Sequence, residues 1–176
     1  MNKSNSLSFI FGRRSIRSYA SGDVDEKTLK TILEAAMSAP SACACDPWRF
    51  VVVKTQAMRE LIVEKLPYGK MLLEAPVGIV VCGDLKAAHD GQLSYMLQDC
   101  SAAIENLLLA AHSLGLGACW LGVHPREERI NHIKAVLALP ESVIPIAVIA
   151  LGHPGEKKEP RTRYKTENVK FEKWSD

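Results

Sequence analysis

The sequence predicts one globular domain in which helices and strands alternate. The chain has 176 residues, 47% of them apolar and 24% charged, which is enough apolar material for a single core. Apolar residues recur at helical spacing in some segments and form short β-branched runs in others. No Gly/Ser-rich linker, low-complexity run or internal repeat interrupts the chain, so we expect residues 1–176 to form one domain. This alternation by itself favours a parallel, doubly wound sheet.

The first predicted helix follows the acidic segment Asp23 to Glu26. Its apolar positions follow the i, i+3, i+4, i+7 spacing, and Pro40 ends it; they are Leu29, Ile32, Leu33, Ala36 and Met37. A strand of β-branched residues is predicted at Phe50 to Val53.

A second helix is predicted from about Met58 to Leu66, where Pro67 and Gly69 stop it. A second strand follows at Val77 to Cys82. The longest helix, from about Leu93 to Leu114, carries apolar residues over more than one stripe. We therefore expect it to be covered on most sides, by the sheet and by another subunit.

The remaining elements are a short strand at Ala118 to Gly122, a helix that begins at Pro125 and a strand at Ile144 to Gly152. Beyond them, residues 153–176 form a polar, basic tail that carries Phe171 and Trp174. Large aromatic residues on a polar tail need a surface on which to be buried.

Composition limits the class of protein. The formal net charge of +2 is too close to neutral for a chain that binds nucleic acid or a membrane surface as a whole. The longest apolar stretches, Ala75 to Cys82 and Ile144 to Leu151, are far shorter than the ~20 residues of a membrane-spanning helix. Met1 to Phe9 has no signal-peptide pattern, so we expect a cytoplasmic protein. The five cysteines are an odd set and predict free thiols.

Two basic clusters are the strongest chemical signal. The first contains Arg13, Arg14 and Arg17, with Ser15 between them; the second contains Lys157, Lys158, Arg161, Arg163 and Lys165. Guanidinium groups suit a phosphate or a carboxylate. If the clusters meet, they form an anion site; if they stay apart, they are solvated surface charge.

A small-residue loop, Ser38 to Phe50, lies between the end of the first helix and the first strand. Either its backbone approaches a flat ligand, or it is simply a well-packed connection. Cys43 and Cys45 suggest a metal, but no CxxC or paired histidine completes a four-ligand set, so no metal site is predicted. The glycine-rich run Gly115 to Gly122 leads from a helix into a strand, the reverse of a dinucleotide-binding turn.

Taken together and in order, these segments resemble the FMN-dependent nitroreductase family, from about Phe9 to Trp174. The family motifs are matched by Arg13, Arg14, Ser15 and Arg17, by Ala39 to Ala42, by Pro47 and Trp48, by the helix residues Gln98 to Ala111, by Gly115 to Trp120, by the strand that ends in Gly152, and by Pro160 to Arg163. Each motif alone is weak, whereas the full order is specific.

The resemblance implies a different sheet from the one the alternation favours. It implies an α+β, three-layer nitroreductase-like fold with a central mixed sheet flanked by helices. It also implies an intertwined homodimer with FMN at two equivalent sites on the subunit boundary, and a tail, about residues 153–176, that packs on the partner.

The resemblance further implies which residues bind the cofactor. Arg13, Ser15, Arg161 and Arg163 would contact the FMN phosphate, and the backbone around Arg14 the ribityl chain. Arg17 would lie near N1 and O2 of the ring, where a fixed cation stabilises the negative charge of the reduced form. The implied ring neighbours are Pro40, Ser41, Ala42 and Cys43, and, through backbone groups, Trp120, Leu121 and Gly122. No side chain is expected to act as a catalytic acid or base.

Two positions depart from the family pattern. Ala44 stands where many members have Asn, and Asp46 where Gln usually precedes Pro-Trp. They leave the substrate class open more than the cofactor. Lys70 receives no role, and neither does the redox chemistry of Cys43 or Cys45.

The function implied by the resemblance is that of an oxidoreductase passing a hydride from NADH or NADPH, through FMN, to a nitroaromatic, quinone or similar acceptor by a ping-pong mechanism. The preferred donor and the physiological acceptor stay open. One alternative is a non-catalytic protein that binds, stores or senses FMN. A third interpretation, a phosphoester or nucleotide binder that uses both arginine clusters, predicts a colourless protein.

Overall fold

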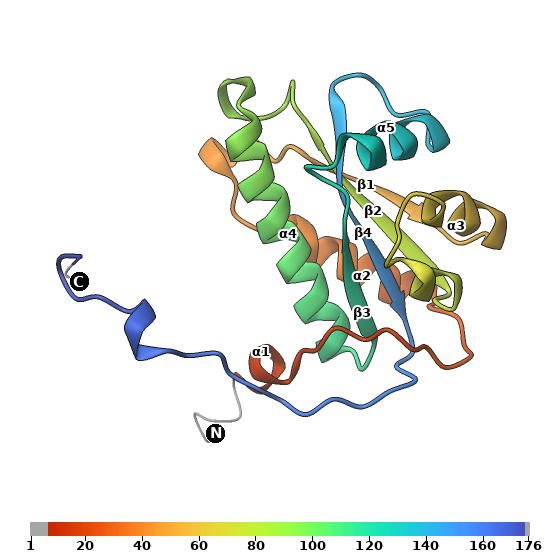
Figure 1. The fold of residues 1–176 in the computed structure, drawn as a ribbon, viewed down its shortest axis with the longest axis horizontal. Helices are drawn as coiled ribbons and strands as arrows, with labels where there is room; N and C mark the ends of the chain where they lie inside the picture. The colour runs from red at the N-terminus through yellow and green to blue at the C-terminus, as the bar shows by residue number, and fades with distance from the viewer. Residues whose placement is uncertain (1–6, 175–176) are drawn as a thin grey trace.

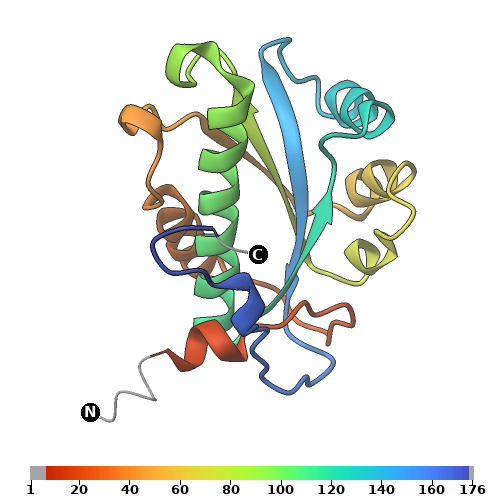
Figure 2. The ribbon, with the colours of Figure 1, turned by 60° about the vertical axis from the view of Figure 1, so that its left-hand side comes forward.

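A four-stranded sheet lies between two layers of helices in the computed structural model, which describes residues 7–174 (Figures 1 and 2). The strand order is β1-β2-β4-β3. The elements are α1 (Ser8–Gly12), α2 (Glu26–Met37), β1 (Trp48–Val53), α3 (Gln56–Val63), β2 (Val77–Asp84), α4 (Leu93–Ser113), β3 (Gly117–Gly122), α5 (Glu127–Val136) and β4 (Val143–Gly152). Short 3-10 turns, η1 to η4, occupy Ala42–Ala44, Lys70–Leu73, His89–Gly91 and Thr166–Asn168.

The strand directions correct one prediction and refine another. Every adjacent strand pair is antiparallel, so the parallel sheet favoured by the alternation is wrong. β2 and β3 do run the same way across the α4 connection, but β4 inserts between them in the opposite direction. The α+β class, with the sheet between helices, is confirmed. Within residues 7–174 the one parallel contact to the sheet is an isolated bridge between Ser15 and Ala118, so the named strands are antiparallel rather than mixed.

The two faces of the sheet bury different sets of helices because side chains alternate along each strand. On β2, Val77, Ile79 and Val81 belong to the core shared with α2 and α4. Val80 and Cys82 belong to the second core, with α3, η2 and α5. Figure 2 shows α4 on one side of the sheet and α3 and α5 on the other.

Local signals explain where α2 begins and how α4 is placed. Asp25 caps α2 by accepting a hydrogen bond of 2.9 Å from the Thr28 backbone N–H. α4 buries residues from Met96 to Ala111 against the sheet and α2, while Leu109 and Ala110 stay only half-buried, Ala110 still packing against that core. No helix in the described part of the chain is long and apolar enough to cross a membrane.

The cysteines behave as predicted from their apolar surroundings. All five are free thiols, and Cys82, Cys100 and Cys119 are buried. Burial raises the pKa of Cys82 and of Cys100 to about 12, so both thiols stay protonated near neutral pH.

The two ends of the chain meet at the β3 edge. After α1, the segment Arg13 to Tyr19 runs beside β3, and the Ile16 backbone N–H donates to the Ala118 carbonyl at 3.0 Å. The buried phenol of Tyr19 fixes the segment by donating to the carbonyls of Ile16 and Ala150. Past Pro160 the tail extends away from the sheet and helices (Figure 1). Its last two residues, 175 and 176, lie outside the described part of the chain. So do residues 1–6, which belong to the segment Met1 to Phe9 where no signal-peptide pattern was found.

Candidate functional site

The two basic clusters come together in the folded chain. Partial loss of hydration lowers the pKa of Arg14, and repulsion from Arg161, Arg13 and Arg163 lowers it further, in that order. Such repulsion requires guanidinium groups from both ends of the chain to lie near one another. The cluster therefore carries excess positive charge that an anion would neutralise.

A cavity of about 420 Å³, here called the basic cavity, opens beside this cluster. Its wall is built from Gly12 to Arg14, from Leu108 and His112 of α4, and from Glu156 to Lys158. Arg13 is paired with Glu105 at 3.2 Å, and Lys158 with Glu156 at 2.9 Å. Among the described residues, Arg14 and Lys157 have no carboxylate within ion-pair distance, so they can meet a ligand's phosphate.

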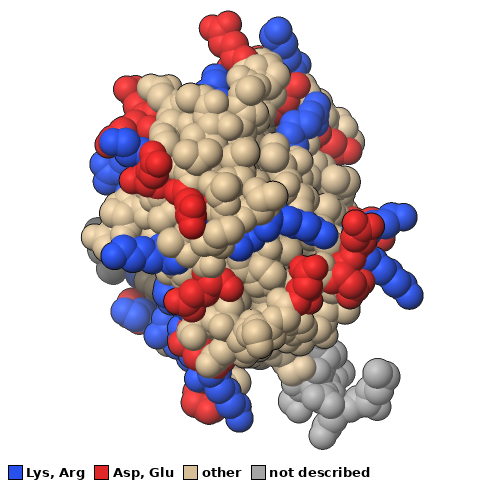
Figure 3. Space-filling model, turned by 90° about the vertical axis from the view of Figure 1, so that its right-hand side faces the viewer, with Lys and Arg blue, Asp and Glu red and all other residues tan. Residues whose placement is uncertain are grey.

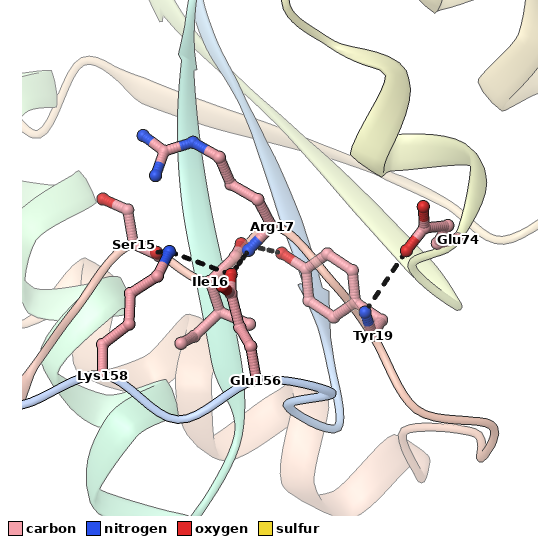
Figure 4. A network of polar contacts seen from close by, with 7 residues as sticks. All are labelled: Ser15, Ile16, Arg17, Tyr19, Glu74, Glu156 and Lys158. Atoms are coloured by element: carbon pink, nitrogen blue, oxygen red, sulfur yellow. Dashed lines mark hydrogen bonds and ion pairs between the residues drawn. The ribbon is translucent and has the colours of Figure 1, made fainter.

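Glu156 and Lys158 fix the backbone on which the first cluster stands (Figure 4). The Arg17 backbone N–H donates to Glu156 Oε1 at 2.6 Å, and Lys158 Nζ donates to the Ser15 carbonyl at 2.8 Å. Because these donors stabilise its charged form, the pKa of Glu156 is lowered, first by the Arg17 N–H and then by Lys158. The side chain of Arg17 points away from this pair and reaches across β3.

A second cavity, here called the edge cavity, has a volume of about 230 Å³ and follows the same strand toward its other end. Arg17 lines it, together with Trp120, Leu121 and Gly122 of β3. Tyr68 and Arg129 also line it, the first before η2 and the second on α5. Trp120 is partly exposed, so an aromatic surface is available to a flat ligand.

The small-residue loop lies elsewhere in the same chain. The Ala42 backbone N–H donates to Asp99 Oδ1 near the start of α4, at 2.9 Å, whereas His112 of the basic cavity lies near the end of that helix. At a rise of ~1.5 Å per residue, these positions on α4 are about 20 Å apart. The structure therefore does not bring Pro40, Ser41, Ala42 or Cys43 to the arginines within one chain.

Asp46, one of the two departures, closes this loop. Ser41 Oγ donates to Asp46 Oδ1 at 2.5 Å, and the Asp46 N–H donates back to Ser41 Oγ at 3.1 Å. Cys43 and Ala44 have positive φ values of 50° and 53°, a backbone region that favours glycine. The Cys43 thiol lies 3.8 Å from His89 Nε2. Asp46 thus holds a strained turn in place.

Sequence reasoning missed several residues that the structure adds to these cavities. Glu156 had no role assigned, and Lys158 was named only as a member of the second basic cluster, although an acidic residue within a basic tail was a usable signal. His112 of α4 lines the basic cavity, where burial and then Arg13 lower its pKa. Arg129 carried no signal, because only the fold brings α5 to β3. Lys70 is exposed at the start of η2, beside the edge cavity.

The arrangement fits a ligand with a phosphate at one end and a flat ring at the other. Ile16 belongs to the basic cavity and Arg17 to the edge cavity, and Ala118 and Cys119 of β3 divide in the same way. A ligand lying along this edge would therefore meet excess cations first and then the exposed face of Trp120. Charges of both signs are interspersed on the surface of α3 and α5 (Figure 3), so that face offers no comparable single-sign patch.

Comparison with known proteins gives a consistent family match. The family model described as "Nitroreductase family" matches residues 10–153. A Methanothermobacter thermautotrophicus protein named "Putative NADH dehydrogenase/NAD(P)H nitroreductase" is 45% identical over 174 residues, covering 99% of this chain and 90% of that protein.

Two solved structures extend the match to the fold. An FMN-dependent nitroreductase from Clostridium difficile aligns with a TM-score of 0.87 and 28% identity, covering 96% of this chain and 99% of the other. A Desulfovibrio desulfuricans protein solved in complex with FMN aligns with a TM-score of 0.82 and 34% identity, covering 96% and 97%.

Proposed function

We infer the function of this chain from its family, because the chain belongs to the nitroreductase family. The protein is an NAD(P)H-dependent FMN oxidoreductase that reduces a small electron acceptor. The observation that carries this conclusion is the pair of cavities along one strand edge, one with excess cations and one with an exposed tryptophan beside Arg17.

The basic cavity is the proposed site of the FMN phosphate. Arg13, Ser15, Arg161 and Arg163 are the proposed phosphate ligands, and the backbone at Arg14 the contact to the ribityl chain. What supports this is the excess positive charge at Arg14, which a phosphate would compensate. Lys158 adds a supporting role, since it holds the Ser15 carbonyl.

The edge cavity is the proposed site of the ring. The chemistry that FMN supplies when bound is two-electron transfer from NAD(P)H to the acceptor. The guanidinium of Arg17 would supply a fixed positive charge to N1 and O2 of the ring, and the backbone groups of Trp120, Leu121 and Gly122 would orient it. Tyr19, with its phenol bound to two carbonyls and its pKa raised by burial, is not available as a proton donor.

The site is completed by a second copy of the chain in this proposal. The small-residue loop lies beside the start of α4, too far from the basic cavity for its residues to reach the arginines of their own chain; these residues are Pro40, Ser41, Ala42 and Cys43. The tail also exposes Phe171 and Trp174, at 86% and 80% of their surfaces, which a partner would cover. We therefore propose a homodimer with two FMN sites. We also propose a cytoplasmic location.

A spectrum of the purified protein followed by anaerobic titration tests the function. The protein should be yellow, and NADH or NADPH should bleach the absorbance near 450 nm in the absence of oxygen. Return of the colour on adding a nitroaromatic or a quinone would complete the cycle. A yellow protein that no nicotinamide bleaches would instead be an FMN-binding protein without this activity, and a colourless protein that cannot be loaded with FMN would overturn the cofactor assignment.

A further inference from the structure

Arg129 is the feature of the edge cavity that the proposed cofactor leaves without a use. Its side chain reaches back from α5 to β3, where Nη1 donates to the Gly122 carbonyl at 2.8 Å. That bond fixes one end of the guanidinium against the strand. The other nitrogens have no hydrogen-bond partner among the described residues.

The edge cavity carries two positive charges that no carboxylate balances. Arg17 and Arg129 both line it, and none of its described lining residues is acidic. Of the nearby carboxylates, Glu156 lies 2.9 Å from Lys158, and Glu128, next to Arg129 in the chain, lies 3.0 Å from Lys65. Glu74 accepts the Tyr19 backbone N–H at 3.4 Å and does not line the cavity. A cavity lined by two guanidinium groups, neither with an ion-pair partner among the described residues, favours an anionic occupant.

The two arginines cannot share one task. Arg17 is the proposed partner of N1 and O2 of the ring, and FMN places its phosphate at the other cavity. Arg129 therefore remains at the Gly122 end of the strand, beside the aromatic side chains of Trp120 and Tyr68. A guanidinium next to aromatic surface is suited to a planar molecule that carries a carboxylate or phosphate at its edge.

We propose that Arg129 is a specificity-determining residue that binds the oxyanion of the substrate, so that this enzyme prefers anionic substrates over neutral ones of the same shape. The proposal rests on the proposed function, because it assumes that the FMN ring contacts the Arg17 guanidinium. The oxyanion could be the carboxylate of an aromatic acceptor or the additional phosphate of NADPH, and both present the same chemistry to a guanidinium.

Binding measurements on the FMN-loaded protein test the proposal without requiring turnover. Calorimetric titration with benzoate and with benzamide, which match in shape and differ in charge, should give tighter binding of benzoate. Arg129→Gln should weaken benzoate about tenfold, as expected for the loss of a charged hydrogen bond, and leave benzamide unchanged. Arg129→Lys, which keeps the charge, should retain part of the preference.

Arg126→Gln is the matched control, because Arg126 is exposed at the start of the same helix and does not line the cavity. A second arm titrates NADP⁺ and NAD⁺. If Arg129→Gln loses the preference for benzoate over benzamide, the oxyanion is the carboxylate of an acceptor; if it loses the preference for NADP⁺ over NAD⁺, the oxyanion is the additional phosphate of NADPH. Equal effects on the two ligands of each arm, or no effect in either arm, would overturn the proposal. Failure of NAD(P)H to bleach FMN would overturn the function instead, while the binding arms would still report on Arg129.

Discussion

Arg161 tests at the level of one residue whether the two ends of the chain share a single anion. It lies on the exposed tail, so its replacement should not disturb the core. Arg161→Ala should raise the Kd for FMN about tenfold, because one charged hydrogen bond to phosphate is lost. Fluorescence titration measures this, with riboflavin, which lacks the phosphate, expected to bind with unchanged affinity.

Lys165→Ala provides the control for tail charge, since its ammonium lies 3.8 Å from the Glu167 carboxylate instead of at the cavity. An equal loss of FMN affinity in both variants would mean that Arg161 acts only through net charge.

Glu156 gives a pH dependence whose sign follows from its environment. Its pKa in the folded protein is lowered from 4.5. The stabilisation of the fold by the Glu156 carboxylate is therefore fully present above about pH 4.5 and is lost as the pH falls through the lowered pKa. Glu156→Gln should therefore be less stable than the wild type near pH 7, by less than about 1 kcal/mol for an exposed pair, and the two should converge in acid. Urea unfolding at several pH values measures the difference, and a constant gap down to pH 3 would contradict the assignment.

Residue identities alone predicted part of this site. The arginines and Ser15 were identifiable because their order resembles the family's, and the structure brings the two clusters together. Arg129 and His112 could not be predicted, because a helix-borne side chain has no signature until the packing places it at a cavity. Asp46 was identifiable as a departure from the family pattern, whereas its hydrogen bonds to Ser41 became visible only in the fold.

At the scale of elements, β3 and the amino-terminal segment approach each other closely at Gly117. A Cβ at this position would lie 2.8 Å from Ile16 Cγ2, tighter than side-chain contacts allow. Gly117→Ala should therefore cost about 1–3 kcal/mol through overpacking, and lower Tm by about 2–4 °C per kcal/mol. Thermal unfolding followed by circular dichroism measures the shift.

Gly122→Ala on the same strand is the matched comparison for stability, because its added Cβ meets no atom within 4 Å. Its Tm should stay within the range of a neutral surface change. Comparable losses in both variants would point to a general cost of alanine in β3.

Periodicity predicted the elements better than their arrangement. The helical spacing of Leu29 to Met37 and the β-branched run at Phe50 to Val53 correspond closely to α2 and β1. The relative direction of the strands could not be predicted from periodicity, because a strand buried on both faces has the same apolar run whether its neighbours are parallel or antiparallel. The resemblance therefore corrected the parallel sheet where composition could not. The single turn of α1 was too short to leave a periodic signal.

For the whole molecule, the exposed tail predicts a concentration-dependent assembly. A chain that ends at Lys165 would keep Arg161 and Arg163 but lose Phe171 and Trp174. Its dimer Kd should rise at least about tenfold, because aromatic anchors dominate the energy of such contacts. Sedimentation velocity over a range of concentrations measures the shift, and Phe171→Ser with Trp174→Ser in the full chain should reproduce it. An unchanged Kd in both proteins would place the dimer contact elsewhere.

The pairing of Ile16 with Ala118 has one more consequence. β3 is an outermost strand of the sheet, and the Ile16 N–H occupies the Ala118 carbonyl, which would otherwise be free to bind a foreign strand. If bound FMN holds the segment Arg13 to Tyr19 in place through its contacts with the arginines, loss of FMN would free the edge of β3 and favour aggregation. Flavin-depleted preparations should then precipitate on storage sooner than loaded ones.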